Sequence, residues 1–81
     1  MIKVIIEVDG YLNQVLLTGR KCSKKELKQK YLQAKALTTH IKDLANVFSR
    51  LHNFEQIPYD SEIQIDFVID TDTDRIYSPS Y

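Results

Sequence analysis

The feature that most limits the fold of this chain is the spacing of its apolar residues across residues 23–52. Apolar or small side chains recur there at alternating steps of three and four, which places them on one face of an α-helix. The positions on this face are Leu27, Tyr31, Ala34, Leu37, Thr38, Ile41, Leu44, Ala45, Phe48 and Leu51. Ser23 and Glu26 match the capping box that begins many helices. Cys22 and Leu27 stand at the two positions of a hydrophobic staple, so the sequence predicts one long amphipathic helix over residues 23–52.

The predicted helix is too long for the sheet that the rest of the chain can form. It would span roughly 43 Å, about twice the length of a six-residue strand. One outcome is a break within residues 37–40, where Thr38 and Thr39 lower the helix propensity. The other is an intact helix that buries its overhanging apolar face against a second copy of the chain. We favour the intact helix, and with it a homo-oligomer, most simply a dimer.

A β-hairpin is predicted before the helix. Residues 2–8 place their even-numbered side chains, all of them aliphatic, on one face of a strand. Asp9-Gly10 suits a two-residue type I′ turn, because both turn positions require a positive φ. The returning strand is then residues 11–17. This turn pairs Val8 with Tyr11, Val4 with Val15 and Ile2 with Leu17.

The C-terminal part predicts a third strand over residues 62–69, where Ile63, Ile65, Phe67 and Ile69 alternate with other residues. A polar turn and a short edge strand over residues 75–77 follow, with Ile76 beside Ile69. Residues 52–60 are expected to be a connection. The fold class is therefore α+β: one domain over residues 1–81, a two-layer sandwich of order ββαβ(β) whose helix covers the apolar face of the sheet.

Composition excludes several classes of protein. The chain has 81 residues and a single cysteine, so it is one small domain without an internal disulfide. No apolar run approaches the roughly 20 residues that cross a bilayer. Charged residues at Lys3, Glu7 and Asp9 do not suit a secretory signal. We expect a cytoplasmic protein that does not bind a membrane.

The formal net charge of zero hides two segments of opposite sign. Residues 20–35 hold seven Lys and Arg against Glu26, whereas residues 55–81 hold seven Asp and Glu against Arg75. A candidate phosphate site lies at the predicted helix N-terminus, whose N–H groups attract anions. Its residues are Arg20, Lys21, Lys24, Lys28 and Lys35. The other interpretation, which we favour over the phosphate site, is a solvated helix face balanced by the acidic C-terminal hairpin of the same or a neighbouring subunit. Only Tyr31 there could stack on a base.

The spacing of Asp70, Asp72 and Asp74 resembles the beginning of a calcium-binding loop. The sixth position, which requires glycine, is Arg75, and the twelfth position is Tyr81 where the loop requires glutamate. We interpret the segment as a solvated turn and predict no metal site. A weak site for a divalent ion is the alternative.

No set of residues suited to nucleophilic catalysis is apparent. Cys22 lies beside a helix N-terminus and two lysines, which stabilise a thiolate, but it has no histidine near it in the sequence. His40 and His52 are twelve residues apart, unlike the i, i+4 spacing of helical metal ligands. We therefore expect a protein that is not an enzyme and has no cofactor.

The sequence favours a small non-catalytic interaction or regulatory protein that self-associates through its long helix and binds a partner macromolecule. The alternative is a binder of phosphate ligands, either nucleic acid or a nucleotide, through residues 20–35. An enzyme would require a metal ion at residues 70–74.

Overall fold

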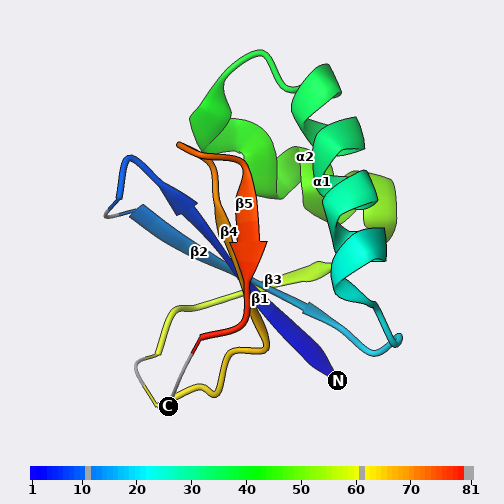
Figure 1. The fold of residues 1–81 in the computed structure, drawn as a ribbon, viewed down its shortest axis with the longest axis vertical. Coiled ribbons are helices and arrows are strands. Elements are labelled where there is room, and N and C mark those ends of the chain that lie inside the picture. Colours follow the sequence, from blue (N-terminus) through cyan, green and yellow to red (C-terminus); the bar gives the residue numbers. More distant parts are fainter. Residues whose placement is uncertain (11, 61, 80–81) are drawn as a thin grey trace.

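The computed structural model describes residues 1–10, 12–60 and 62–79, which form a mixed sheet with two helices on one face (Figure 1). The elements are β1 (Ile2–Val8), β2 (Leu12–Thr18), α1 (Lys24–Leu37), the 3₁₀ turn η1 (Ile41–Asp43), α2 (Leu44–His52), β3 (Glu55–Ile57), β4 (Phe67–Asp70) and β5 (Arg75–Tyr77). The sheet order among the described residues is β3-β2-β1-β4-β5. Only β1 and β4 pair in parallel, and the other neighbours are antiparallel. The α+β class is confirmed.

The single long helix is wrong, because the chain breaks at the threonines. Thr38 is extended, with φ −90° and ψ 124°, and its hydroxyl donates to the carbonyl of Ala34 at 2.6 Å. Its N–H donates to the carbonyl of Lys35 at 3.1 Å. The chain resumes at η1, where Nδ1 of His40 accepts from the N–H of Lys42 at 3.3 Å. Helix α2 then returns alongside α1 (Figure 1).

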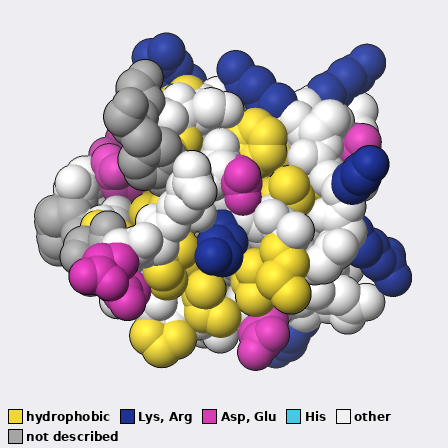
Figure 2. Space-filling view, turned by 90° about the horizontal axis from the view of Figure 1, so that it is seen from below, with side chains coloured by type: hydrophobic (Ala, Val, Ile, Leu, Met, Phe, Trp, Pro, Cys, Tyr) yellow, Lys and Arg dark blue, Asp and Glu magenta, His cyan; other side chains and the backbone are white. Residues whose placement is uncertain are grey.

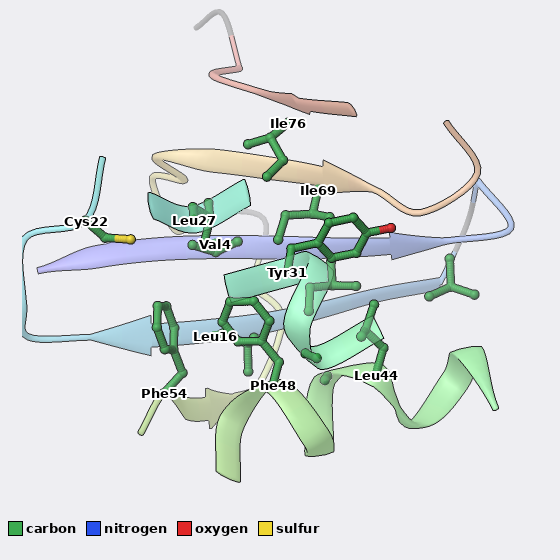
Figure 3. Close-up of a cluster of buried hydrophobic side chains, with 14 residues drawn as sticks. Val4, Leu16, Cys22, Leu27, Tyr31, Leu44, Phe48, Phe54, Ile69 and Ile76 are labelled. Atoms are coloured by element: carbon green, nitrogen blue, oxygen red, sulfur yellow. The ribbon is translucent and has the colours of Figure 1, made fainter. Parts of the chain in front are cut away.

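The break allows both halves of the apolar face to cover the same side of the sheet (Figure 3). Among the fully buried side chains are Leu27, Tyr31, Ala34, Leu44, Ala45 and Phe48. They meet Val4, Ile6 and Leu16 of the sheet in one core cluster. Of the large hydrophobic residues on the predicted face, Leu37 and Leu51 remain 65% and 44% exposed. The body measures 32 × 27 × 22 Å, so the overhang that was to recruit a second copy does not exist.

The hairpin has the predicted positive φ at both turn positions, but its register differs, and the two-residue turn that would pair residues 8 and 11 is not formed. Asp9 and Gly10 both have positive φ, at 56° and 75°. However, Ile5 pairs with Val15 and Val8 with Leu12, one residue away from the prediction. Tyr11, the predicted partner of Val8, lies outside the described residues. A slip of one residue turns each β2 side chain to the opposite face, so Leu16 faces the helices and Val15 faces away.

The C-terminal strands confirm the prediction in part. Strand β4 is shorter than predicted, and β3 forms within the predicted connection. Ile69 pairs with Ile76 as expected. Val68 turns to the other face of the sheet, in a second small cluster. The members of that cluster are Ile5, Val15, Ile65 and Val68.

The cap of α1 provides a test of the local structure. The Ser23 hydroxyl accepts from the N–H of Glu26 at 3.2 Å. Ser23→Ala should lower the free energy of unfolding by about 1 kcal/mol, because one N–H group of the first turn loses its acceptor. Urea denaturation measures the change. Ser78→Ala, at an exposed position, should leave the midpoint in place, and an equal loss in both variants would contradict the capping role.

Candidate functional site

Charge is divided between the two layers of the fold. The helical segment, residues 20–53, contains nine Lys and Arg against Glu26 and Asp43, an excess of seven positive charges. The strands and their loops contain nine Asp and Glu against Lys3 and Arg75, an equal negative excess. Figure 2 shows Lys and Arg side chains mainly along the upper and right-hand rim of its view. We name residues 20–53 the helical layer, and its outer side is the candidate site.

The residues predicted to bind phosphate divide into two groups. Arg20 and Lys21 are exposed in the connection before α1, and Lys24 is exposed in its first turn. Lys25, which the sequence prediction omitted, is exposed beside them. Lys28 and Lys35 lie farther along α1 and are only partly exposed. The structure therefore does not bring the five predicted residues into one open patch.

Lys28 and Lys35 instead contact Asp74, in the turn between β4 and β5. Nζ of Lys35 lies 2.5 Å from Oδ1 of Asp74. Nζ of Lys28 donates to the main-chain carbonyl of Asp74, and the Tyr31 hydroxyl donates to the same Oδ1. Residues 28, 31 and 35 share one side of a helix, so one helix face presents three donors to one residue. The sequence analysis expected the acidic C-terminal hairpin to balance this helix face, but it did not single out Asp74, which lies 39 residues after Lys35.

Tyr31 does not provide the stacking surface that the sequence suggested. Its side chain is fully buried, and its hydroxyl points toward the end of the sheet where β4 leads into the turn (Figure 3). Nζ of Lys28 and Nζ of Lys35 lie 5.9 and 5.8 Å from its ring centroid. Burial, and then the hydrogen bond to Asp74, raise the pKa of Tyr31, so the phenol remains a donor. The hydrogen bonds from Lys35 and Tyr31 hold the pKa of Asp74 below its usual value.

The acidic turn does not gather its carboxylates. Oδ1 of Asp70 accepts from the N–H of Asp72 at 2.9 Å, and Asp74 faces α1. The Thr71 hydroxyl donates to the carbonyl of Glu7 at 2.7 Å and fixes the turn to β1. Within residues 1–10, 12–60 and 62–79, no group of three or more His, Cys, Asp or Glu could hold a metal ion. The turn is therefore a link between the two layers.

The side chains of Cys22 and His52 pack within the fold and contribute to its structure. Cys22 is buried in the core cluster, and burial raises the pKa of its thiol, which is opposite to the stabilised thiolate considered from sequence. Nε2 of His52 lies 3.0 Å from the carbonyl of Lys30, and its ring meets the Phe48 ring edge-on at 5.1 Å. His52 thus joins the end of α2 to the middle of α1.

A shallow hollow of about 190 Å³ lies on the sheet face opposite the helices. Its described lining is mainly aliphatic and includes Ile5, Ile63, Val68 and Pro79, with Tyr59 and Asp60 at its polar side. Such a lining can hold a small apolar group and offers one carboxylate for chemistry. Among the described lining residues, no nucleophile and base lie together.

None of the helices among the described residues is long and apolar enough to span a bilayer. Comparison of the chain with protein-family models, with curated proteins and with solved structures finds no match.

Because of the contacts of Asp74, the free energy of unfolding should decrease at acidic pH. Because the pKa of Asp74 is lower in the folded chain, its contribution to stability is present above the ordinary aspartate pKa of 3.8 and is lost as the pH falls through the lowered pKa. Asp74→Asn should cost about 1 kcal/mol at pH 7, and the difference from wild type should shrink toward pH 2. Urea denaturation at both pH values measures this. Asp72→Asn, in the same turn, should not reproduce the pattern.

His52 should add a second dependence, nearer neutrality. Desolvation by burial lowers its pKa from 6.5, so the unfolded chain takes up a proton more readily. The contribution of His52 to stability is therefore present above pH 6.5 and decreases as the pH falls below it. The urea midpoint of wild type should fall between pH 7.5 and 5.5, and His52→Gln should show a flatter profile. The same slope in both proteins would assign the effect to another group.

Proposed function

We propose that this protein is a small non-catalytic interaction protein that binds an acidic protein partner through the outer side of its helical layer. The observation that carries the proposal is the excess of seven positive charges on that layer, in a chain whose formal net charge is zero. Such a layer attracts and orients a negatively charged surface. The nine Asp and Glu residues outside residues 20–53 belong to the strands and their loops, which form the other layer.

The apolar residues of the helical layer favour a protein partner over nucleic acid. Leu32, Leu37 and Leu51 are 47%, 65% and 44% exposed on α1 and α2. A protein interface buries such side chains at its centre, whereas a phosphate backbone offers them no apolar surface. Seven of the nine cations are lysines, which lack the planar fork of arginine for bidentate phosphate recognition. Tyr31, the stacking candidate, is buried.

A binding role without catalysis agrees with the surroundings of the reactive side chains. The Cys22 thiol is buried among core residues, and its raised pKa disfavours the nucleophilic thiolate. His52 is held against the Lys30 carbonyl, away from the exposed cations. These groups stabilise the helical layer, and the exposed lysines and leucines are left for a partner.

Self-association remains a prediction, but it can no longer rest on a single long helix. The long helix that was to form the interface is two shorter helices, and their shared apolar face is buried in the core. A second copy could place its acidic strands and loops against the helical layer. A second copy of the chain is therefore one of the acidic partners that this surface could bind. Light scattering across a range of salt concentrations separates this case from binding to a different protein.

A pair of synthetic peptides tests the proposal. One peptide repeats Glu and Leu at helical spacing, and the other has serine in place of leucine. The protein should bind the first peptide more tightly, and affinity should fall as salt rises. Lys24→Gln with Lys25→Gln should weaken binding about tenfold, because two charges leave the contact surface. Isothermal titration calorimetry measures the affinities.

A variant with the same change in net charge serves as the control. Gln64→Glu with Ser78→Glu alters two exposed positions outside the helical layer and should leave the affinity nearly unchanged. Equal weakening in both double variants would show that only the overall charge matters, and would contradict a site on the helical layer. A DNA duplex that binds more tightly than the Glu-Leu peptide would favour the phosphate-binding alternative.

A further inference from the structure

Three donors of α1 converge on one residue of the opposite layer, two of them on its carboxylate and one on its main-chain carbonyl. We name Lys28, Tyr31 and Lys35 the cradle, because all three side chains converge on Asp74. The phenol is fixed by burial, and the two ammonium groups lie near its ring. This preformed set of donors is suited to a carboxylate at the surface of the helical layer.

The charges of the cradle are not balanced by Asp74. Lys35 pairs with the carboxylate, whereas Lys28 donates to the main-chain carbonyl, a group without formal charge. Two ammonium groups therefore meet the Asp74 carboxylate. Besides burial and the contact with Asp74, the negative charge of Asp70 also acts on Tyr31 and raises its pKa. The side chains of Lys35 and Asp74 are 38% and 41% exposed, so the cradle can be reached from solvent. An additional or replacing anion would be attracted there.

Asp74 can leave the cradle without unfolding the turn. Its φ of 58° lies in the left-handed region, which glycine adopts freely and other residues adopt with strain. The turn is held independently by Thr71, which bonds to the carbonyl of Glu7 through both its hydroxyl and its N–H. Pairing of Ile69 with Ile76 also fixes the two strands. A change of the Asp74 side-chain rotamer would therefore move its carboxylate out of the cradle and retain these contacts.

Leu32 lies beside the cradle on the surface of α1. It stands four residues after Lys28 and three before Lys35, so helical spacing makes it a neighbour of both. Its side chain is 47% exposed. A partner with an acidic residue next to an apolar one would therefore meet complementary groups at this point.

We propose that the cradle is a carboxylate-binding subsite, which the free chain fills with its own Asp74 and which an Asp or Glu side chain of the partner occupies in the complex. This inference rests on the proposed function and names the partner group that is recognised. Asp74 acts as an internal competitor. Its departure adds two cations to the surface already formed by Arg20, Lys21, Lys24 and Lys25.

Removal of the competitor tests the inference. Asp74→Gly suits the left-handed backbone and frees the cradle, so it should bind the Glu-Leu peptide roughly fivefold more tightly than wild type. Asp72→Gly makes the same change in net charge in the same turn, without a contact to α1, and should not gain affinity. Asp74→Asn, which also tolerates the left-handed backbone, provides a second variant and should show a smaller gain. Circular dichroism verifies that each variant is folded.

The cradle itself is tested in the Asp74→Gly background. Lys28→Gln with Lys35→Gln should abolish the gain in affinity. Acetate, compared with chloride at equal ionic strength, should raise the melting temperature of Asp74→Gly more than that of Asp72→Gly. This acetate effect supports the subsite even where the peptide does not bind wild type. Equal responses of the two glycine variants to both probes would overturn the subsite, while peptide binding by wild type would still support the helical layer.

Discussion

Burial of the apolar helical face against one side of the sheet is the constraint on which the remaining structure depends. The apolar helical face that contains Leu27, Tyr31 and Phe48 must be covered along its whole length. The sheet is much shorter than a continuous thirty-residue helix would require. Because the chain breaks into two helices, both parts of the apolar face are buried against the sheet within one chain. The same arrangement turns the polar sides of both helices outward, and these sides carry most of the lysines. The basic helical layer is thus a consequence of the core.

Sequence reasoning succeeded where the determining interactions are local. Ser23 caps α1 because its hydroxyl accepts from the N–H of Glu26, three residues later, and this spacing can be read directly from the sequence. Asp9-Gly10 adopts positive φ for an equally local reason. Even the pairing of Ile69 with Ile76 required only a short polar turn between two strands. The set of apolar positions on the helices was also correct, since most of them are buried.

Prediction from sequence failed where the structure depends on contacts between distant parts of the chain. The hairpin register could not be read from the alternation, because Ile5 and Val15 are as aliphatic as Val4 and Leu16, and the sheet buries apolar residues on both faces. The sequence marked residues 37–40 as the place of a possible break, which we did not favour. Whether the helix breaks there depends on how much sheet is available, which the helical sequence does not encode. For the site, the basic residues were found, but their separation into exposed and paired groups depends on Asp74, a residue from the other layer.

A chain with zero formal charge can still present a strongly charged surface, because salt limits how far each charge is felt. At physiological ionic strength the screening length is about 8 Å, whereas the body extends 22 Å along even its shortest axis. A partner that approaches the helical layer therefore meets its cations with the opposite charges largely screened. Asp74 is an exception, because it brings one negative charge into contact with α1. In the proposed subsite, the group that occupies the place of Asp74 would decide whether Lys28 and Lys35 stabilise the fold or contact the partner.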